Sequence, residues 1–307
     1  MTSAVVFAYS EVGVRGLREL LAQGIHIPLL FSHADDPNEN QWFGSVQRLA
    51  QDHKLNIVTP DSANTAQWIA KGAAPRPDFV FSFYYRHMLD KAWLILPRLG
   101  ALNIHGSLLP KYRGRAPVHW AIIHGEKSTG ASLHYMVEKP DAGALVDQEA
   151  VPILENDTAL EVSMKVAAAA ETVLHRSLPR LIAGTALAQS LNLSAGSYFG
   201  RRRPEDGRID WSRGARGVHD LVRAVAPPFP GAFTEVKGCR VAVLETRLDP
   251  KPLQYPRQAP CLYASEGTWY ADCVDGRLKI LQLTVNNRPV AHNTVPPALS
   301  EQPLALS

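Results

Sequence analysis

Short apolar runs alternate with helical patterns at regular intervals over the first half of the chain. Runs rich in β-branched and aromatic residues occupy 4–9, 25–31, 55–60, 78–85 and 101–105. Helical patterns between these runs repeat their apolar residues with the spacing of one helix face, as in "RGLRELLAQG" and "FGSVQRLAQDH". This alternation predicts a Rossmann-like α/β fold, a doubly wound and mostly parallel sheet with helices on its faces.

The middle of the chain extends this sheet. Two further strand-like runs, 131–137 and 144–153, are joined through a tight turn. A long helical pattern follows, which opens with a capping box of Thr158 and Glu161 and ends at Gly184. We therefore expect two more strands and one long helix in the first domain.

The last third of the chain predicts a second, smaller domain. Residues 190–208 show neither period, and we interpret them as the crossing between domains. Short strand-like runs with Gly and Asp turns come next, which is typical of a small β-barrel. The expected domains are a catalytic one over 1–203, with its linker from about 190, and an OB-like one over 204–307.

Charge and apolar content limit the partners of the protein. The net charge of +3 gives no global positive field, so no nucleic acid is expected as a partner. The N-terminal "MTS" leads directly into a strand-like run, and no apolar stretch is long enough for a membrane span. We therefore expect a cytoplasmic protein without membrane insertion.

Metal and dinucleotide sites are not predicted. The histidines show no zinc-binding spacing, and Cys239, Cys261 and Cys273 are expected to be buried or incidental thiols. Gly13 and Gly16 follow the first strand without the fingerprint of a dinucleotide site. The candidate chemistry therefore lies elsewhere in the chain.

Asn103 and His105 stand at the end of the predicted strand 101–105. Side chains alternate along a strand, so both project to one side of the sheet, and ligands of open α/β sheets bind outside the carboxyl ends of the strands. An amide beside an imidazole can stabilise an oxyanion and transfer protons. The same pair can also satisfy only the backbone of the following turn, so the pair alone leaves both roles open.

The run 103–117, "NIHGSLLPKYRGRAP", resembles the signature of the folate-dependent formyltransferases. In that family an Asn-x-His at a strand end precedes Ser-Leu-Leu-Pro, and an Asp downstream corresponds to Asp141 here. Residues 199–211 and 223–233 are similar to segments at the start of the family's C-terminal domain, so the resemblance covers nearly the entire chain. Within the family, the match is closest to the formyltransferase domain of the bifunctional enzymes that make UDP-4-formamido-4-deoxy-L-arabinose.

The resemblance implies catalytic roles for Asn103, His105 and Asp141. The amine of the acceptor would attack the formyl group of N10-formyltetrahydrofolate, the implied co-substrate, and no metal would take part. Asn103 and His105 would stabilise the oxyanion, and charged His105 would pass a proton towards the leaving nitrogen. Asp141 would favour the imidazolium and help, through water, to take the proton that the amine loses.

The folate site implied by the resemblance lies between the loop after the fourth strand and the turn around the Asp. Much of the folate contact in such enzymes is through the backbone, so side-chain identity is weakly diagnostic there. The corresponding residues are His87, Met88, Leu89, Arg115, Val137, Glu138, Lys139, Pro140 and Asp141.

The implied acceptor is the 4-amino group of UDP-4-amino-4-deoxy-L-arabinose, whose formylation serves lipid A modification and polymyxin resistance. Another nucleotide-linked amino sugar and methionyl-tRNA are the alternatives within the family. A tRNA enzyme requires a basic surface, whereas residues 33–44 are net acidic, and Arg115 and Trp120 also favour the sugar nucleotide.

Two alternatives lie outside this activity. A hydrolase that releases formate would leave the barrel domain without a purpose, and a folate-binding module would not need the full trio.

In the bifunctional enzymes a decarboxylase follows the formyltransferase. Whether this protein works with such a domain or partner stays open.

Overall fold

The computed structural model describes residues 1–35, 40–251, 253, 259–291, 294–300 and 303–306. Contacts divide the chain into two compact units. The first comprises Met1–Pro117, Ser128–Pro152 and Ser163–Gly200, and the second comprises Val118–Lys127, Ile153–Val162 and Arg201–Ser307. The first unit holds the predicted α/β sheet and the second holds the barrel, while the domain boundary expected after residue 203 stays a prediction.

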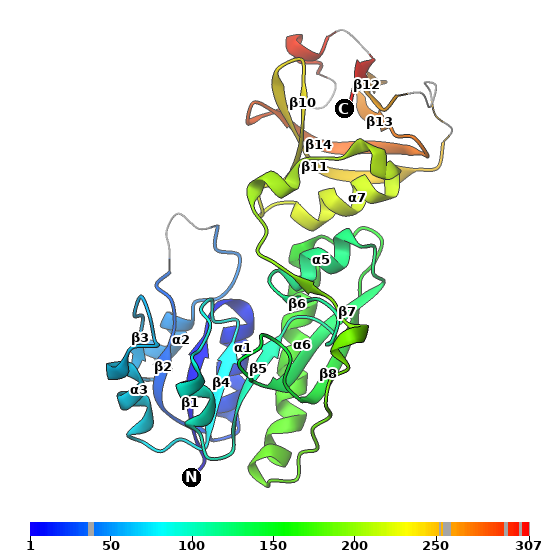
Figure 1. Ribbon diagram of the computed structural model, residues 1–307. Coiled ribbons are helices and arrows are strands. Elements are labelled where there is room, and N and C mark those ends of the chain that lie inside the picture. The colour runs from blue at the N-terminus through cyan, green and yellow to red at the C-terminus, as the bar shows by residue number, and fades with distance from the viewer. Residues whose placement is uncertain (36–39, 252, 254–258, 292–293, 301–302, 307) are drawn as a thin grey trace. The chain divides into compact units, whose positions relative to one another are not determined.

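In the described residues, seven strands form the sheet of the first unit in the order β3-β2-β1-β4-β5-β7-β8 (Figure 1). The first five of these are mutually parallel, whereas β7 pairs antiparallel with β5 and β8 antiparallel with β7. The predicted doubly wound, mostly parallel sheet is confirmed. The strands are β1 (Ser3–Ala8), β2 (His26–Phe31), β3 (Ile57–Val58), β4 (Phe79–Phe83), β5 (Gly100–His105), β7 (Ser128–Tyr135) and β8 (Leu145–Pro152).

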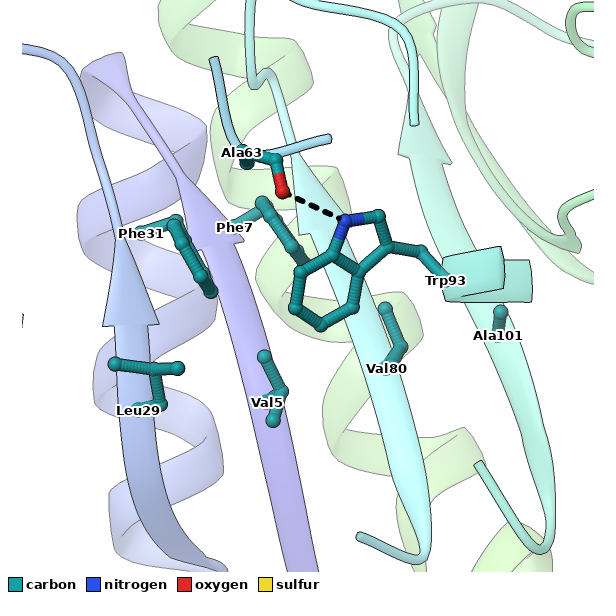
Figure 2. Packing of buried hydrophobic residues seen from close by; sticks show 8 residues of the cluster. All are labelled: Val5, Phe7, Leu29, Phe31, Ala63, Val80, Trp93 and Ala101. Atoms are coloured by element: carbon teal, nitrogen blue, oxygen red, sulfur yellow. Dashed lines mark hydrogen bonds between the residues drawn. The ribbon is translucent and has the colours of Figure 1, made fainter. Parts of the chain in front are cut away.

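An aromatic core covers one face of this sheet. Phe7 of β1 and Phe31 of β2 stack with ring centroids 4.5 Å apart, and Trp93 packs edge-on against both. The indole Nε1 donates a hydrogen bond to the carbonyl of Ala63 at 3.1 Å, as Figure 2 shows. Trp93 belongs to α4 (Lys91–Ile95), and α3 (Ala66–Ala73) packs closely enough that a Cβ on Gly72 would lie 2.3 Å from the indole. The core therefore makes β1, β2 and β4 a rigid platform.

Helices α1 (Ser10–Ala22) and α6 (Ala159–Ile182) pass behind the sheet in Figure 2. Arg15 of α1 donates to Glu171 of α6 at 2.8 Å, and His175 lies 3.0 Å from Glu19. A further helix, α2 (Val46–Asp52), contacts α1. The sheet is thus covered on both faces, which explains why its inner strands are continuous apolar runs.

Two elements differ in length from the sequence-based prediction. The strand expected over 55–60 pairs with β2 only at Ile57 and Val58. The N–H of Leu55 instead donates a hydrogen bond to the carbonyl of Ala50 at the end of the preceding helix. Helix α1 begins at Ser10, earlier than the pattern indicated. Gly16 lies within this helix, where a Cβ would come within 2.7 Å of the Phe83 ring. The absence of a side chain at Gly16 therefore lets α1 pack closely against β4.

The order of the strands reverses between β1 and β4. The chain runs from β1 to β2 on one side of this point and from β4 to β5 on the other, while β1 and β4 pair with each other. In open α/β sheets the carboxyl ends of the strands at such a point form the ligand-binding crevice. A ligand site is therefore expected at the carboxyl ends of β1, β4 and β5.

The second unit is built around an antiparallel sheet in the order β10-β11-β14-β13-β12-β16, with β15 paired to β14. It forms the nearly closed barrel that the sequence predicted. Its elements are α5 (Pro117–Ile123), α7 (Gly214–Val225), β10 (Ala232–Val236), β11 (Cys239–Asp249), β12 (Cys261–Ser265), β13 (Thr268–Asp272), β14 (Arg277–Val285), β15 (Arg288–Pro289) and β16 (Leu304–Ala305). Single 3-10 turns lie at Pro204–Gly207, Trp211–Arg213 and Pro297–Leu299.

Buried ion pairs stabilise this second unit. Arg277 donates to Asp272 at 2.9 Å, and the hydroxyl of Tyr263 donates to the same carboxylate at 3.0 Å. Arg223 of α7 pairs with Asp220 at 2.7 Å. All three cysteines carry free thiols, as predicted, and Cys261 and Cys273 are buried. No helix in the described part of the chain has the length and apolar character needed to cross a bilayer.

Candidate active site

Asn103 and His105 point to the same side of β5, as predicted from their spacing. In the antiparallel register between β5 and β7, Asn103 lies opposite His134 and His105 lies opposite Ser132. Directly paired residues share one face of a sheet, so His134 lies beside Asn103. His105 and His134 are only 6% and 2% exposed, whereas Asn103 is half-buried and more accessible.

Asp141 completes the cluster. Its Oδ1 lies 3.4 Å from Nδ1 of His105 and 3.6 Å from Nε2 of His134, and its Oδ2 accepts the N–H of Gly114 at 2.8 Å. Burial alone would raise the pKa of the Asp141 carboxyl, but the two histidines and the Gly114 N–H outweigh burial and hold this pKa below its usual range. The structure thus brings an ionised Asp141 together with Asn103 and His105.

The hydrogen bond of His105 to the backbone decides which ring nitrogen faces the carboxylate. Nε2 of His105 lies 2.8 Å from the carbonyl of Tyr112, which only accepts, so Nε2 carries a hydrogen. Nδ1 is therefore the nitrogen that can gain or lose a proton. This nitrogen faces the Oδ1 atom of Asp141 at 3.4 Å.

A short two-stranded sheet supports these contacts. Strands β6 (Arg113–Gly114) and β9 (Tyr198–Phe199) pair in parallel, and the Phe199 ring stacks on Tyr112 with centroids 5.5 Å apart. The N–H of Tyr112 donates to the Ser197 hydroxyl at 2.9 Å. The region expected to be only a crossing between domains therefore holds the loop that fixes His105 and Asp141.

Tyr84, at the end of β4, lies against the same loop. A Cβ on Gly106 would be 1.8 Å from the Tyr84 hydroxyl oxygen, so only glycine fits directly after His105. Burial, with a smaller effect of the Asp141 charge, raises the pKa of the Tyr84 phenol well above its usual value. The Tyr84 hydroxyl therefore stays neutral and adds no charge to the site.

Left-handed backbone conformations gather at this edge of the sheet. Tyr84, Tyr112, Ala116 and Asp141 have φ values of 56°, 56°, 51° and 50°. Non-glycine residues adopt this region rarely, and such residues concentrate at functional sites. The backbone of the cluster therefore has a conformation that is typical of functional sites.

The first group of predicted folate residues follows β4. Met88 is 52% exposed, although its type alone would suggest a core residue, whereas Leu89 packs against the aromatic core. The His87 ring lies edge-on to Tyr85 at 5.7 Å. Asn64 Nδ2 donates to the Met88 carbonyl at 2.9 Å, which fixes this loop in place.

The second group borders Asp141. Val137 is 45% exposed, and Glu138 forms an ion pair of 2.8 Å with Lys91, which links this segment to the one after β4. Lys139 and Pro140 complete the turn that leads into Asp141. Arg115 is exposed, and its guanidinium donates to the Arg86 carbonyl at 2.8 Å, so it too bridges the two segments.

Sequence reasoning missed His134 and the segment Ser197–Phe199. His134 sits in a strand that the sequence predicted, but only the register with β5 places it opposite Asn103. Ser197 and Phe199 act through pairing with a strand far away in the chain. No local sequence pattern predicts either arrangement, because both depend on long-range strand pairing.

Among the residues that the structure describes, no three His, Cys, Asp or Glu side chains are grouped so that they could hold a metal ion.

Comparison with solved structures gives the same fold. The chain is similar to an N-formyltransferase from Helicobacter canadensis, solved in complex with folinic acid and dTDP-3-aminofucose, with 18% identity and a TM-score of 0.70 over 91% of this chain and 99% of that chain. It is similar to a sugar N-formyltransferase from a Shewanella species, with 23% identity and a TM-score of 0.63 over 83% and 100%. A 4-N formyltransferase from Francisella tularensis gives 19% identity and a TM-score of 0.61 over 76% and 91%.

The family is shown by the sequence of the chain itself. Residues 202–293 match the C-terminal domain of formyl transferase. Residues 6–178, more than half of the chain, match formyl transferase and include the whole cluster around Asn103. The chain therefore belongs to the formyl transferase family.

Proposed function

We propose that the protein transfers a formyl group from N10-formyltetrahydrofolate to the amino group of a nucleotide-linked sugar. The observation that carries this proposal is the cluster of Asn103, His105 and Asp141 at the carboxyl end of β5 in a member of the formyl transferase family. An amide hydrogen, an imidazole and an ionised carboxylate are the groups that acyl transfer to an amine needs.

Each group has a distinct role in the transfer. As the amine nitrogen bonds to the formyl carbon, the carbonyl oxygen gains negative charge, and Asn103 donates its amide hydrogen to this oxygen. The bond from the formyl carbon to N10 of the folate then breaks, and His105 gives its Nδ1 proton to N10. Asp141 takes the proton that the amine loses, directly or through water.

A proton transfer within the cluster closes the cycle. Asp141 Oδ1 lies 3.4 Å from Nδ1 of His105, so the proton gained by the carboxyl can return to the imidazole. The products are a formamide and tetrahydrofolate, and the cluster regains its starting charge. No other oxidant, reductant or co-reactant is required.

The residues after β4 and before Asp141 fit a folate. Met88 and Val137 expose apolar side chains on two segments that the Lys91–Glu138 ion pair joins, and these segments flank the point where the strand order reverses. The buried Tyr85 hydroxyl has no hydrogen-bond partner among the described residues, so it can receive one from a ligand. An apolar surface with a few polar groups suits an aromatic pterin.

The proposed acceptor is UDP-4-amino-4-deoxy-L-arabinose, which the resemblance on residues 103–117 implies. Support for a nucleotide-linked amino sugar comes from the Helicobacter structure, whose ligand is dTDP-3-aminofucose. Arg113 is buried, and its Nε has no partner in the described part of the chain, which suits the binding of an anion such as a diphosphate.

A substrate panel tests this proposal. Purified protein is incubated with N10-formyltetrahydrofolate and, separately, with UDP-4-amino-4-deoxy-L-arabinose, dTDP-linked 3-amino and 4-amino sugars, and methionyl-tRNA. We expect the highest kcat/KM with the UDP-linked 4-amino sugar and only a shallow dependence on salt. Efficient formylation of methionyl-tRNA, with every nucleotide sugar unused, would refute the proposal, because tRNA binding requires many phosphate contacts.

A further inference from the structure

His134 lies in the centre of the cluster, and the proposed transfer steps do not use it. Its side chain is 2% exposed and lies between Asn103 and Asp141. We propose that His134 is a positioning residue, whose Nε2 accepts one hydrogen of the Asn103 amide so that the other hydrogen of Nδ2 is directed at the formyl oxygen. This inference rests on the proposed formyl transfer.

The hydrogen bonds of the His134 ring define its tautomer. Nδ1 lies 2.8 Å from the carbonyl of Tyr135, which only accepts, so Nδ1 carries the hydrogen of the neutral ring. Nε2 then has a lone pair, and it lies 3.1 Å from Nδ2 of Asn103. The amide therefore donates one hydrogen to His134 and keeps its second hydrogen for another acceptor.

The orientation of the Asn103 amide depends on this hydrogen bond. If the amide turned over, its oxygen would face the lone pair of Nε2, which leaves two acceptors in contact in a buried place. The formyl oxygen would then lose its donor from Asn103. His134 therefore fixes which atom of the Asn103 amide faces the formyl oxygen.

Two substitutions separate positioning from packing. His134→Leu keeps an apolar volume but has no acceptor for Asn103, and we expect kcat to fall on the order of tenfold to a hundredfold with the KM of both substrates nearly unchanged. His134→Gln offers an amide oxygen at a similar reach and should recover most of this loss. His53→Leu, on the exposed end of α2, serves as the control.

Two kinetic outcomes would overturn the inference. One is an unchanged kcat in His134→Leu, and the other is a Gln variant that is as slow as the Leu variant over the whole pH range, since a packing role alone would give that result. A rise in KM with kcat preserved would also contradict it, because His134 is proposed to act on the transition state.

A measurement without turnover completes the test. In wild-type protein labelled with 15N at histidine, the His134 ring should give the NMR shifts of a neutral ring with hydrogen on Nδ1 at neutral pH. A charged His134 at a pH where the cluster is otherwise intact would overturn the inference. Because this readout needs no acceptor sugar, it stays informative even if the substrate panel rejects the proposed function.

Discussion

Nδ1 of His105 lies 3.4 Å from Oδ1 of Asp141, and the other nitrogen of the ring is held by the Tyr112 carbonyl. This relationship leaves one nitrogen for proton transfer and places a negative charge beside it. The carboxylate is in turn fixed by the N–H of Gly114 at 2.8 Å. The imidazole, the carboxylate beside it and the loop that orients both are therefore parts of one arrangement.

Removal of any one member of the trio should disable catalysis. We expect Asn103→Ala, His105→Ala and Asp141→Ala each to lower kcat about a hundredfold or more, since each removes an interaction made in the transition state. Double variants should lose little beyond the worse single variant, because the groups act as a unit. Steady-state kinetics check this, with His53→Ala as the control. Near-normal kcat in two of the three variants would contradict the assignment.

Gly106→Ala should destabilise the first unit through a clash with Tyr84. A Cβ would lie 1.8 Å from the hydroxyl oxygen and 3.0 Å from the ring carbon that bears it. We expect a loss of about 1–3 kcal/mol in the free energy of unfolding, as measured in urea. Tyr84→Phe removes the nearer atom, so the double variant should regain part of this loss. If the two substitutions simply add, the contact is not the cause.

His119 on α5 should make the stability of the second unit depend on pH. Burial, together with the nearby Arg202, lowers the pKa of His119 to about 4, whereas an unfolded histidine titrates at about 6.5. Between these values the unfolded chain binds a proton that the folded chain does not bind, so stability falls as the pH falls from about 6.5 to about 4.

His119→Gln should remove part of this dependence. Between pH 7 and pH 5, we expect the wild type to lose on the order of 1 to 2 kcal/mol more unfolding free energy than the variant. His124→Gln, one residue beyond the same helix and exposed, should behave as the wild type. Equal losses in wild type and His119→Gln would show that folding does not lower the pKa of His119.

Arg277→Met should be among the most destabilising single changes in the barrel. It would leave the Asp272 carboxylate, 3% exposed, without its cation, and breaking a buried pair in this way costs about 3–5 kcal/mol. The double variant with Asp272→Leu should be much milder. Arg247→Met breaks an exposed pair with Glu245 and should cost less than about 1 kcal/mol. Similar losses in Arg277→Met and Arg247→Met would contradict the buried pair's importance.

The parallel sheet could be predicted because it depends on local patterns. The inner strands β1 and β4 are rich in apolar residues, and the spacing of Asn103 and His105 alone places both on one side of β5. The placement of Asp141 was given by the resemblance to a family and not by any pattern in the residues, since its turn would form in either case. The structure brings its carboxylate to His105.

The contacts that orient these side chains could not be predicted. His134 reaches Asn103 only through the register between β5 and β7, and a shift of one residue would turn it to the other face. Phe199 reaches Tyr112 through pairing over a long stretch of chain. Residues 36–39 of the acidic segment that argued against tRNA lie outside the described residues.

One experiment tests the central claim most directly. The protein is mixed with N10-formyltetrahydrofolate carrying 13C in its formyl group and with UDP-4-amino-4-deoxy-L-arabinose, and the 13C signal is followed by NMR for wild type and Asn103→Ala. We predict that the label moves to a formamide on the sugar in the wild type, and about a hundredfold or more slowly in the variant. Transfer at equal rates in both proteins, or no label on this or any other nucleotide-linked amino sugar, would contradict the account.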